Sequence, residues 1–234
     1  MRSALVGRMR SVAPGLYWRC RNGLALSRWC AMRLMGSRAP DGPYGEAFWD
    51  FHDSGDWTAF ASLIVQHFAP ASVVDVGCGD GKLLGALRVV APAVRGVGYD
   101  SSPDALALAR RRGVEVHQAD LAGWRSRSLA ELGELVGGYD VAICLETAEH
   151  LPPWSAPGLV RALTRSPTVI FSAAQPLQGG TAHMNERPLT YWQARFASEA
   201  FELDPADQAF RDEVGRLDLP WWYGRNVQIF RRCG

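Results

Sequence analysis

A glycine-rich loop between an expected strand and an expected helix restricts the fold of this chain more than any other feature. The segment VVDVGCGDG (73–81) places Gly77, Gly79 and Gly81 directly after an apolar run and at the head of a helix-forming stretch. Glycine is needed where the backbone turns tightly and a ligand approaches without an intervening Cβ. The G-x-G-x-G spacing differs from the G-x-G-x-x-G of a dinucleotide site, and the preceding Asp75 would repel a phosphate. The loop therefore favours a cationic ligand over a pyrophosphate.

The remainder of the chain alternates short apolar runs with amphipathic stretches. Apolar runs bounded by turn residues indicate buried strands, and the helical spacing of Trp57, Phe60 and Ile64 indicates a helix that packs one face on a core. This alternation predicts an α/β fold with a mainly parallel sheet covered on both faces. We expect strands at 71–77, 94–100, 114–120, 139–145 and 167–174, a closing antiparallel pair at 201–204 and 226–232, and helices at 56–68, 82–90, 102–113 and 188–200.

Charge and cysteine content narrow the class of protein. The net charge of +1 conceals eight arginines and no acid in residues 1–40, which leaves 17 basic against 24 acidic residues, or −7, for the rest. An acidic body is a poor surface for a nucleic-acid backbone. Five cysteines without a C-x-x-C pair indicate reduced thiols and a cytoplasmic protein. No apolar run of about 18 residues exists, so we expect no transmembrane helix.

Residues 1–45 form a basic N-terminal extension to a domain expected at 46–234, with the turn-rich segment 37–45 between them. Four interpretations of the extension are open. It is a mobile or partly helical leader that covers the active site, or it results from a start codon assigned too far upstream. Alternatively it is an amphipathic helix that lies on a membrane or partner, or an organellar targeting peptide. The first two interpretations are preferred. A secretory signal is excluded because arginines interrupt any apolar core.

Two acids follow the next two expected strands, where a doubly wound fold binds its ligand. Asp100 ends the second strand and Asp120 the third. With the loop at 73–81, they make residues 56–231 resemble the class I S-adenosylmethionine-dependent methyltransferases. The alternative is that the glycines of the loop only form a turn and the acids only cap helices, in an NAD-binding or unliganded fold.

The resemblance implies a Rossmann-like, seven-stranded, mainly parallel sheet with one antiparallel strand. It also implies that the glycine loop passes under the methionine moiety, that Asp100 with Ser101 holds the ribose hydroxyls, and that Asp120 with Leu121 recognises the adenine. S-adenosylmethionine is then the cofactor and S-adenosylhomocysteine the product. The residues expected to contact the cofactor are Asp75, Gly77, Cys78, Gly79, Asp100, Ser101, Asp120, Leu121 and Leu145.

Two polar segments follow the fourth and fifth strands, on the side where a methyl acceptor would bind. They are ETAEHLPP (146–153) and QPLQGGTAHMNERP (175–188). If the first begins a helix, its two glutamates and its histidine face one way. Both segments resemble a bacterial methyltransferase subgroup that carries Glu-x-x-Glu-His-Leu-Pro and Gly-Gly-x-x-His-x-Asn-Glu stretches and often a late Trp-Tyr-x-x-Asn. The candidate catalytic residues are Glu146, Glu149, His150 and His183.

Three roles remain open for these four residues. His150 or His183 is a general base oriented by one of the two glutamates. Alternatively all four ligate a divalent cation, as in the similar small-RNA 2′-O-methyltransferases, with types that suit Mg²⁺, Mn²⁺ or Zn²⁺. In the third, Glu146 contacts the cofactor region while Glu149 and His150 hydrogen-bond loop amides. We prefer the base and expect no resident metal.

The predicted function is O-methylation of a hydroxyl of a small metabolite, sugar or natural product, with N- and C-methylation left open. The alternatives are a cyclase of the same fold that binds the cofactor without methyl transfer, and a metal-dependent RNA 2′-O-methyltransferase, which the −7 charge opposes. Gln175 and Gln178 offer hydrogen bonds to a hydroxylated acceptor. Asn185 and Glu186 either do the same or cap the following helix. The aromatic set Trp192, Trp221, Trp222 and Tyr223 is expected to line the pocket wall.

Overall fold

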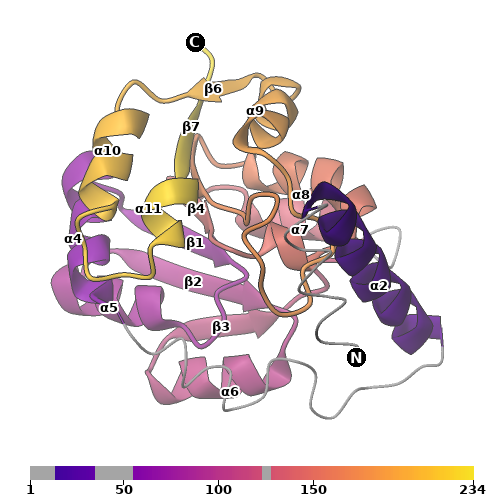
Figure 1. The fold of residues 1–234 in the computed structure, drawn as a ribbon. Helices are drawn as coiled ribbons and strands as arrows, with labels where there is room; N and C mark the ends of the chain where they lie inside the picture. Colours follow the sequence, from indigo (N-terminus) through magenta and orange to yellow (C-terminus); the bar gives the residue numbers. More distant parts are fainter. Residues whose placement is uncertain (1–13, 35–54, 123–127) are drawn as a thin grey trace.

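The computed structural model describes residues 14–34, 55–122 and 128–234, and it is built around a seven-stranded sheet (Figure 1). The strand order is β3-β2-β1-β4-β5-β7-β6, and only β7 runs antiparallel to its neighbours. The predicted sheet, with its closing antiparallel pair, is confirmed. The strands are β1 (Ser72–Val76), β2 (Arg95–Asp100), β3 (Glu115–Gln118), β4 (Val141–Cys144), β5 (Thr168–Phe171), β6 (Phe201–Leu203) and β7 (Gln228–Arg232).

Alternating strand residues divide the core into two apolar layers. In β4, Ala142 and Cys144 join one buried cluster, whereas Val141 and Ile143 join the other. Because successive side chains of a strand point to opposite faces, both faces of the sheet are buried. One layer is covered by α7 (Ser128–Val136), α8 (Ala156–Leu163) and α9 (Leu189–Ala197), and the other by α4 (Trp57–Phe68), α5 (Lys82–Val90), α6 (Pro103–Arg111), α10 (Asp207–Val214) and α11 (Trp222–Asn226).

Local sequence explains where the early helices begin. The Asp56 side chain accepts a hydrogen bond from the Ala59 amide (2.8 Å) at the start of α4. The Ser102 side chain accepts one from Ala105 (3.3 Å) before α6, whose first residue is Pro103. Both are preferred arrangements at a helix N-terminus.

The strands are shorter than the apolar runs that predict them. The third strand ends at Gln118 rather than 120, and the fifth ends at Phe171 rather than 174. The ladder between β4 and β5 stops at the pair Cys144 and Phe171, so the residues beyond it are free to form loops. The candidate site is built from these loops at the carboxyl edge of the sheet.

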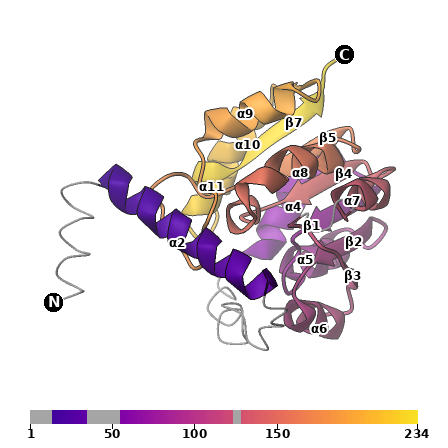
Figure 2. The same cartoon turned by 90° about the vertical axis from the view of Figure 1, so that its right-hand side faces the viewer.

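Part of the basic extension is a helix, α2 (Pro14–Leu34), that lies along one side of the sheet domain (Figure 2). Trp29 of this helix packs against the core cluster under α7, α8 and α9, and its ring lies 6.0 Å from that of Trp154. The predicted boundary at 37–45 lies outside the described residues. Among the helices in the described ranges, none has the length and apolar character needed to cross a membrane.

Candidate functional site

The glycine loop adopts the backbone conformation that its sequence requires. Gly77, Gly79 and Gly81 all have positive φ angles, of 85°, 53° and 74°. The Gly77 amide donates to the Tyr99 carbonyl (2.7 Å), which ties the loop to β2. A Cβ on Gly77 would overlap the Thr147 side chain. Glycine at 77 therefore lets the loop after β1 pack directly on the turn after β4, which brings the cofactor side and the acceptor side together.

Two carboxylates, the buried Asp75 and the half-buried Asp100, lie beside this loop. Asp75 is 5% exposed, and its burial, followed by the negative charge of Asp100, raises its pKa from 3.8 to about 7. Asp100 accepts hydrogen bonds from the amides of Gly79 (3.0 Å) and Ser102 (2.8 Å). Burial also raises the pKa of Asp100, and these amide hydrogen bonds oppose the rise. Two interacting acids, one of them buried, are costly to ionise without a cation, so the residues present fit a positively charged ligand.

The other predicted cofactor residues lie along the same edge of the sheet. Asp120 follows β3 and accepts a hydrogen bond from the Ala122 amide (3.1 Å), and Leu121 beside it is buried. Cys78 is buried in the glycine loop, and Leu145 follows β4. β3, β2, β1 and β4 are parallel neighbours, so their carboxyl ends form one continuous edge.

The turn after β4 differs from the helix considered for ETAEHLPP. Ala148–His150 is a single 3₁₀ turn, and Glu146 precedes it with a φ of 46°. A positive φ is unfavourable for a residue with a Cβ, so tertiary contacts must hold it. The Glu146 amide hydrogen-bonds the carbonyl and the hydroxyl of Ser172, both at 3.0 Å. The three residues are therefore not aligned on one helix face, and Glu146 is directed by the loop after β5 instead.

A network of amide side chains surrounds the Glu146 carboxylate. Asn226 donates to Oε1 (3.0 Å) and Gln178 donates to Oε2 (3.1 Å). Gln175 donates to the Asn226 side-chain oxygen (3.0 Å), so both glutamines expected to bind the acceptor are engaged with this network. Burial raises the pKa of Glu146, while hydrogen bonds from Asn226, Ser172 and Gln178 lower it.

Glu149 is a buried acid close to Glu146. It is 1% exposed, and within the described ranges no hydrogen bond of ordinary geometry reaches either carboxylate oxygen. Burial, followed by the negative charge of Glu146, raises its pKa well above the ordinary value. Its backbone carbonyl accepts hydrogen bonds from the amides of Met184 (2.8 Å) and Asn185 (3.0 Å). Loop amides therefore bind the main chain of Glu149, and its carboxyl group remains available to a ligand.

The two candidate histidines meet at this acid. The rings of His150 and His183 lie 4.7 Å apart at an angle of 78°. Glu149, His150 and His183 each offer one potential ligand atom, and these atoms lie within 4.8 Å of one another. Glu146 is not in this group, so the set of four considered from sequence becomes a set of three.

The carboxylate that hydrogen-bonds to the His183 ring is Glu186, not Glu146 or Glu149 as expected from the sequence. Oε1 of Glu186 lies 2.8 Å from Nδ1 of His183, and both side chains are buried. Neither Asn185 nor Glu186 caps α9, which begins after Pro188 without a side-chain cap. Arg21 of α2 forms an ion pair with Glu186, a contact that the sequence gives no signal for because 165 residues separate the two.

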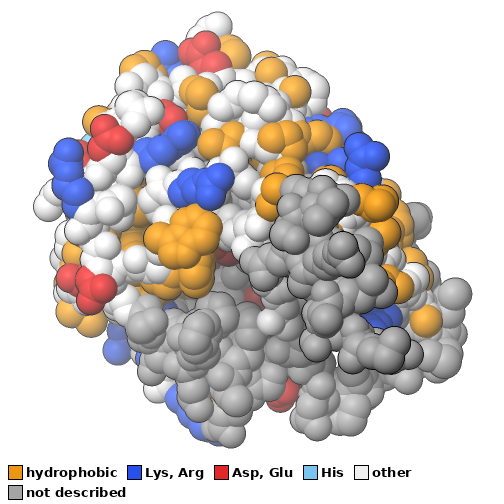
Figure 3. Space-filling view, in the orientation of Figure 1, with side chains coloured by type: hydrophobic (Ala, Val, Ile, Leu, Met, Phe, Trp, Pro, Cys, Tyr) orange, Lys and Arg blue, Asp and Glu red, His pale blue; other side chains and the backbone are white. Residues whose placement is uncertain are grey.

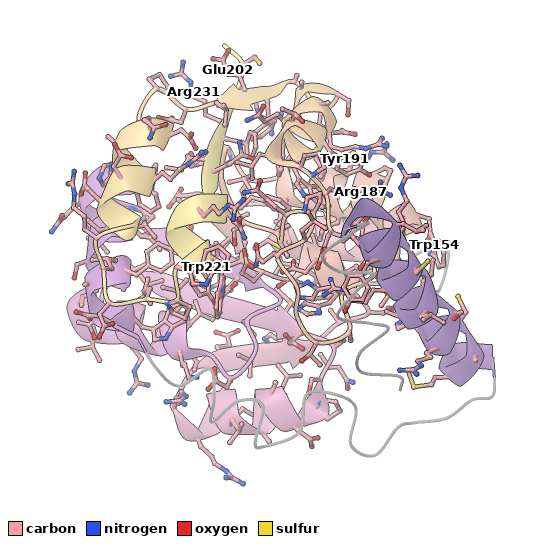
Figure 4. The ribbon with its side chains drawn as sticks, in the orientation of Figure 1. Trp154, Arg187, Tyr191, Glu202, Trp221 and Arg231 are labelled. Atoms are coloured by element: carbon pink, nitrogen blue, oxygen red, sulfur yellow. The ribbon has the colours of Figure 1, made fainter. Side chains whose placement is uncertain are left out.

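The aromatic residues expected to form one wall have different environments. Trp192 is fully buried in the core, 4.9 Å from Phe171, so it does not line the site. Trp221 is 57% exposed, with Arg225 over its ring (5.6 Å), on the face that Figures 3 and 4 show. Tyr223 is buried, and its burial and the charges of Glu146 and Glu149 raise its pKa, so its phenol stays neutral beside the two acids.

A family model described as a methyltransferase domain matches residues 49–208. The chain belongs to this methyltransferase family. Its sheet order and glycine loop are those of the class I S-adenosylmethionine-dependent methyltransferase fold. These findings confirm the predicted family, fold and cofactor.

Two curated methyltransferases resemble part of the chain. The trans-aconitate 2-methyltransferase of Mycobacterium sp. (strain KMS) is 45% identical over 80 residues, which cover 34% of this chain and 32% of that protein. The ubiquinone biosynthesis O-methyltransferase of Xanthomonas oryzae pv. oryzae (strain PXO99A) is 34% identical over 99 residues, which cover 42% and 38%. The methyltransferase thus spans about a third of the length of the curated relatives it matches.

A solved structure shares the fold across most of the chain. S-adenosylmethionine-bound CalS10, an amino pentose methyltransferase from Micromonospora echinaspora, superimposes with a TM-score of 0.51 at 18% identity. The match covers 76% of this methyltransferase and 92% of CalS10. At this identity the likeness establishes the fold and leaves the acceptor open.

Proposed function

We propose that this methyltransferase methylates a hydroxyl group of a small polar metabolite or sugar, held between the turn after β4 and the loop at 172–188. The observation that supports the proposal most is the group formed by the buried Glu149 and His183 and the half-buried His150. Two of the three residues follow Thr147 in the chain, and Thr147 is the residue that packs against the glycine loop. This position supports a place for the acceptor beside the cofactor.

The cofactor supplies an electrophilic methyl group on a sulfonium. The protein has to align the acceptor oxygen with that methyl group and remove the hydroxyl proton, because a neutral hydroxyl is a weak nucleophile at neutral pH. His183 supplies an imidazole whose Nδ1 is engaged by Glu186, which leaves Nε2 to take the proton. The raised pKa of Glu149 favours its neutral form, whose O–H donates a hydrogen bond to an acceptor oxygen.

A second candidate mechanism uses a divalent cation in the same place. Glu149, His150 and His183 bring three ligand atoms within 4.8 Å, and both carboxylate oxygens of Glu149 lack a hydrogen bond within the described ranges. These donor types suit Mg²⁺, Mn²⁺ or Zn²⁺, and such an ion would lower the pKa of the acceptor hydroxyl. Loss of turnover on treatment with EDTA, with recovery on addition of one of these ions, would establish the metal. Turnover that EDTA leaves unchanged would exclude it.

The acceptor class is tested with matched pairs of compounds. Each pair consists of a sugar or phenol and its amino counterpart, and formation of S-adenosylhomocysteine is measured with each. We expect the hydroxyl compounds to support product formation and His183→Gln to lower kcat by about 100-fold or more, the range for loss of a general base. Product formation with the amino compounds alone would contradict the proposal. A rearranged acceptor without S-adenosylhomocysteine would support a cyclase, and salt-sensitive RNA binding with RNA methylation would support an RNA substrate.

A further inference from the structure

Glu186 fixes one nitrogen of the His183 ring. The side chains of Glu186 and His183 are 0% and 7% exposed, and Oε1 and Nδ1 are 2.8 Å apart. The ion pair with the permanently charged Arg21 keeps Glu186 as a carboxylate. An ionised carboxylate only accepts hydrogen bonds. Nδ1 of His183 therefore carries the proton, and Nε2 keeps its lone pair in the neutral ring.

Arg21 reaches the same carboxylate from the basic extension. Its guanidinium pairs with Oε1 of Glu186, although 165 residues separate the two along the chain. Arginine stays protonated under all conditions in which the protein is folded. Its charge offsets the cost of burying an ionised Glu186, which His183 in its neutral form would not do.

Two more contacts anchor α2 to the acceptor side. The surroundings of the Asn22 amide assign its nitrogen as the donor to the His183 carbonyl (3.0 Å) and its oxygen as the acceptor from Nε1 of Trp18 (2.8 Å), the orientation that satisfies both amide atoms. The ring of Trp29 packs edge-on against Trp154, which Figure 4 shows beside α2. Trp154 lies in a second 3₁₀ turn, Pro153–Ser155, which follows the turn at Ala148–His150, so α2 contacts both the segment between β4 and α8 and the loop after β5.

The loop itself is shaped around the His183 ring. A Cβ on Gly180 would overlap Cε1 and Nε2 of that ring. Gly180 also has a φ of 152°, which residues with a Cβ rarely adopt. The ring is thus enclosed by Gly180 on one side and by Glu186 at Nδ1, so its orientation is determined by its surroundings.

We infer that Arg21 and Glu186 are a positioning pair for His183, so that α2 supplies part of the acceptor site. The inference rests on the proposed role of His183 in activating the acceptor hydroxyl. The pair holds the orientation of the His183 ring beside Glu149 and His150, with the Nε2 lone pair free of Glu186. Whether that nitrogen takes a proton or binds a divalent ion, the task needs an oriented, neutral imidazole. The basic extension is on this account a functional element of the enzyme.

Kinetics of two arginine variants test the pair. Arg21→Met removes the charge and keeps an apolar stem, and Arg19→Met, at an exposed position of the same helix, is the matched control. We expect Arg21→Met to lower kcat by about 10-fold to 100-fold, the usual cost of losing a group that orients a functional histidine. The KM for S-adenosylmethionine should stay within about twofold of wild type, because the cofactor residues are untouched, and Arg21→Lys should recover part of kcat. Arg19→Met should match wild type.

The His183 tautomer provides a readout that needs no acceptor. Long-range ¹H–¹⁵N spectra of labelled protein, with the His183 signals assigned by their absence in His183→Gln, should show the proton on Nδ1 in wild type and in Arg19→Met. Arg21→Met and Glu186→Gln should show a mixture of tautomers or a charged ring. Should Glu186→Gln fail to fold, Arg21→Met decides the matter.

Identical tautomers and kcat values in Arg21→Met and Arg19→Met would overturn the inference. If no hydroxyl compound is methylated, yet the tautomer still responds to Arg21→Met, the proposed function falls and the positioning pair stands.

Discussion

Replacement of Asp75 by asparagine should make the unliganded protein more stable at neutral pH while weakening cofactor binding. Asp75 is buried, and its pKa is raised from 3.8 to about 7 by burial and by Asp100. The folded state therefore holds the Asp75 proton more tightly than the unfolded state. Stability is greatest below the unfolded value near 3.8 and falls as the pH rises through about 7. Asp75→Asn removes the carboxyl group that binds this proton and keeps a side chain of nearly the same shape.

The size of the effect follows from the same shift. One pKa unit corresponds to about 1.4 kcal/mol, so the full difference of about 3 units is about 4 kcal/mol when Asp75 is ionised in both states. Between about pH 5 and pH 8, linkage predicts that wild type loses about 2 to 3 kcal/mol of unfolding free energy through this residue. Asp75→Asn should lack this loss, and Asp104→Asn, an exposed acid in the first turn of α6, should retain it.

Urea unfolding of the unliganded proteins across this pH range measures the difference directly. Calorimetry should show in parallel that Asp75→Asn binds S-adenosylmethionine more weakly, because a neutral amide offers no charge to a cationic ligand. Affinity of wild type should also increase up to about pH 7, with proton release on binding below that pH. Parallel stability curves for wild type and Asp75→Asn would refute the assignment of a buried, proton-binding acid beside the glycine loop.

Two further predictions concern the cofactor edge and the acceptor loop. Asp100→Ala removes a carboxylate that also accepts hydrogen bonds from the amides of Gly79 and Ser102. The affinity for S-adenosylmethionine should fall by about 10-fold to 100-fold, which corresponds to the loss of one hydrogen bond to a charged group. An unchanged affinity in calorimetry would refute the ribose-binding role. Gly180→Ala places a Cβ against His183 at a strained φ, so kcat should fall at constant cofactor affinity, whereas Gly85→Ala within α5 should leave kcat unchanged. Equal kcat values for these two glycine variants would show that the Gly180 loop does not determine the His183 orientation.

The fold and the cofactor edge follow largely from local sequence. An apolar run followed by a glycine loop can form only a few structures, and Asp75 and Asp100 lie at the carboxyl ends of two neighbouring parallel strands, one residue before the end of β1 and at the end of β2. The helices at 128–136, 156–163 and 207–214 were not predicted; no side chain caps the start of the last two, so their first turns carry no local signal.

The acceptor side depends on contacts that no local pattern contains. The positive φ of Glu146 is held by Ser172 from the loop after β5, so the helical spacing in ETAEHLPP could not reveal it. Glu186 has equal chemical reason to cap a helix, bind an acceptor or hold His183, and only the folded chain decides among these. Arg21 gives no sequence signal at all, because arginine is abundant throughout the chain and its partner is 165 residues away.

Transfer of a labelled methyl group tests the central claim most directly. The enzyme is incubated with S-adenosylmethionine carrying a ¹³C methyl group and with the hydroxyl compound that gives the most S-adenosylhomocysteine, and the product is examined by ¹³C NMR. We predict one labelled methyl group on oxygen for each S-adenosylhomocysteine formed. The initial rate of labelling should fall by about 100-fold or more in His183→Gln, and it should also fall in Asp100→Ala when the cofactor is not saturating. A label on nitrogen or carbon, or labelling of oxygen at the wild-type rate in His183→Gln, would contradict the account.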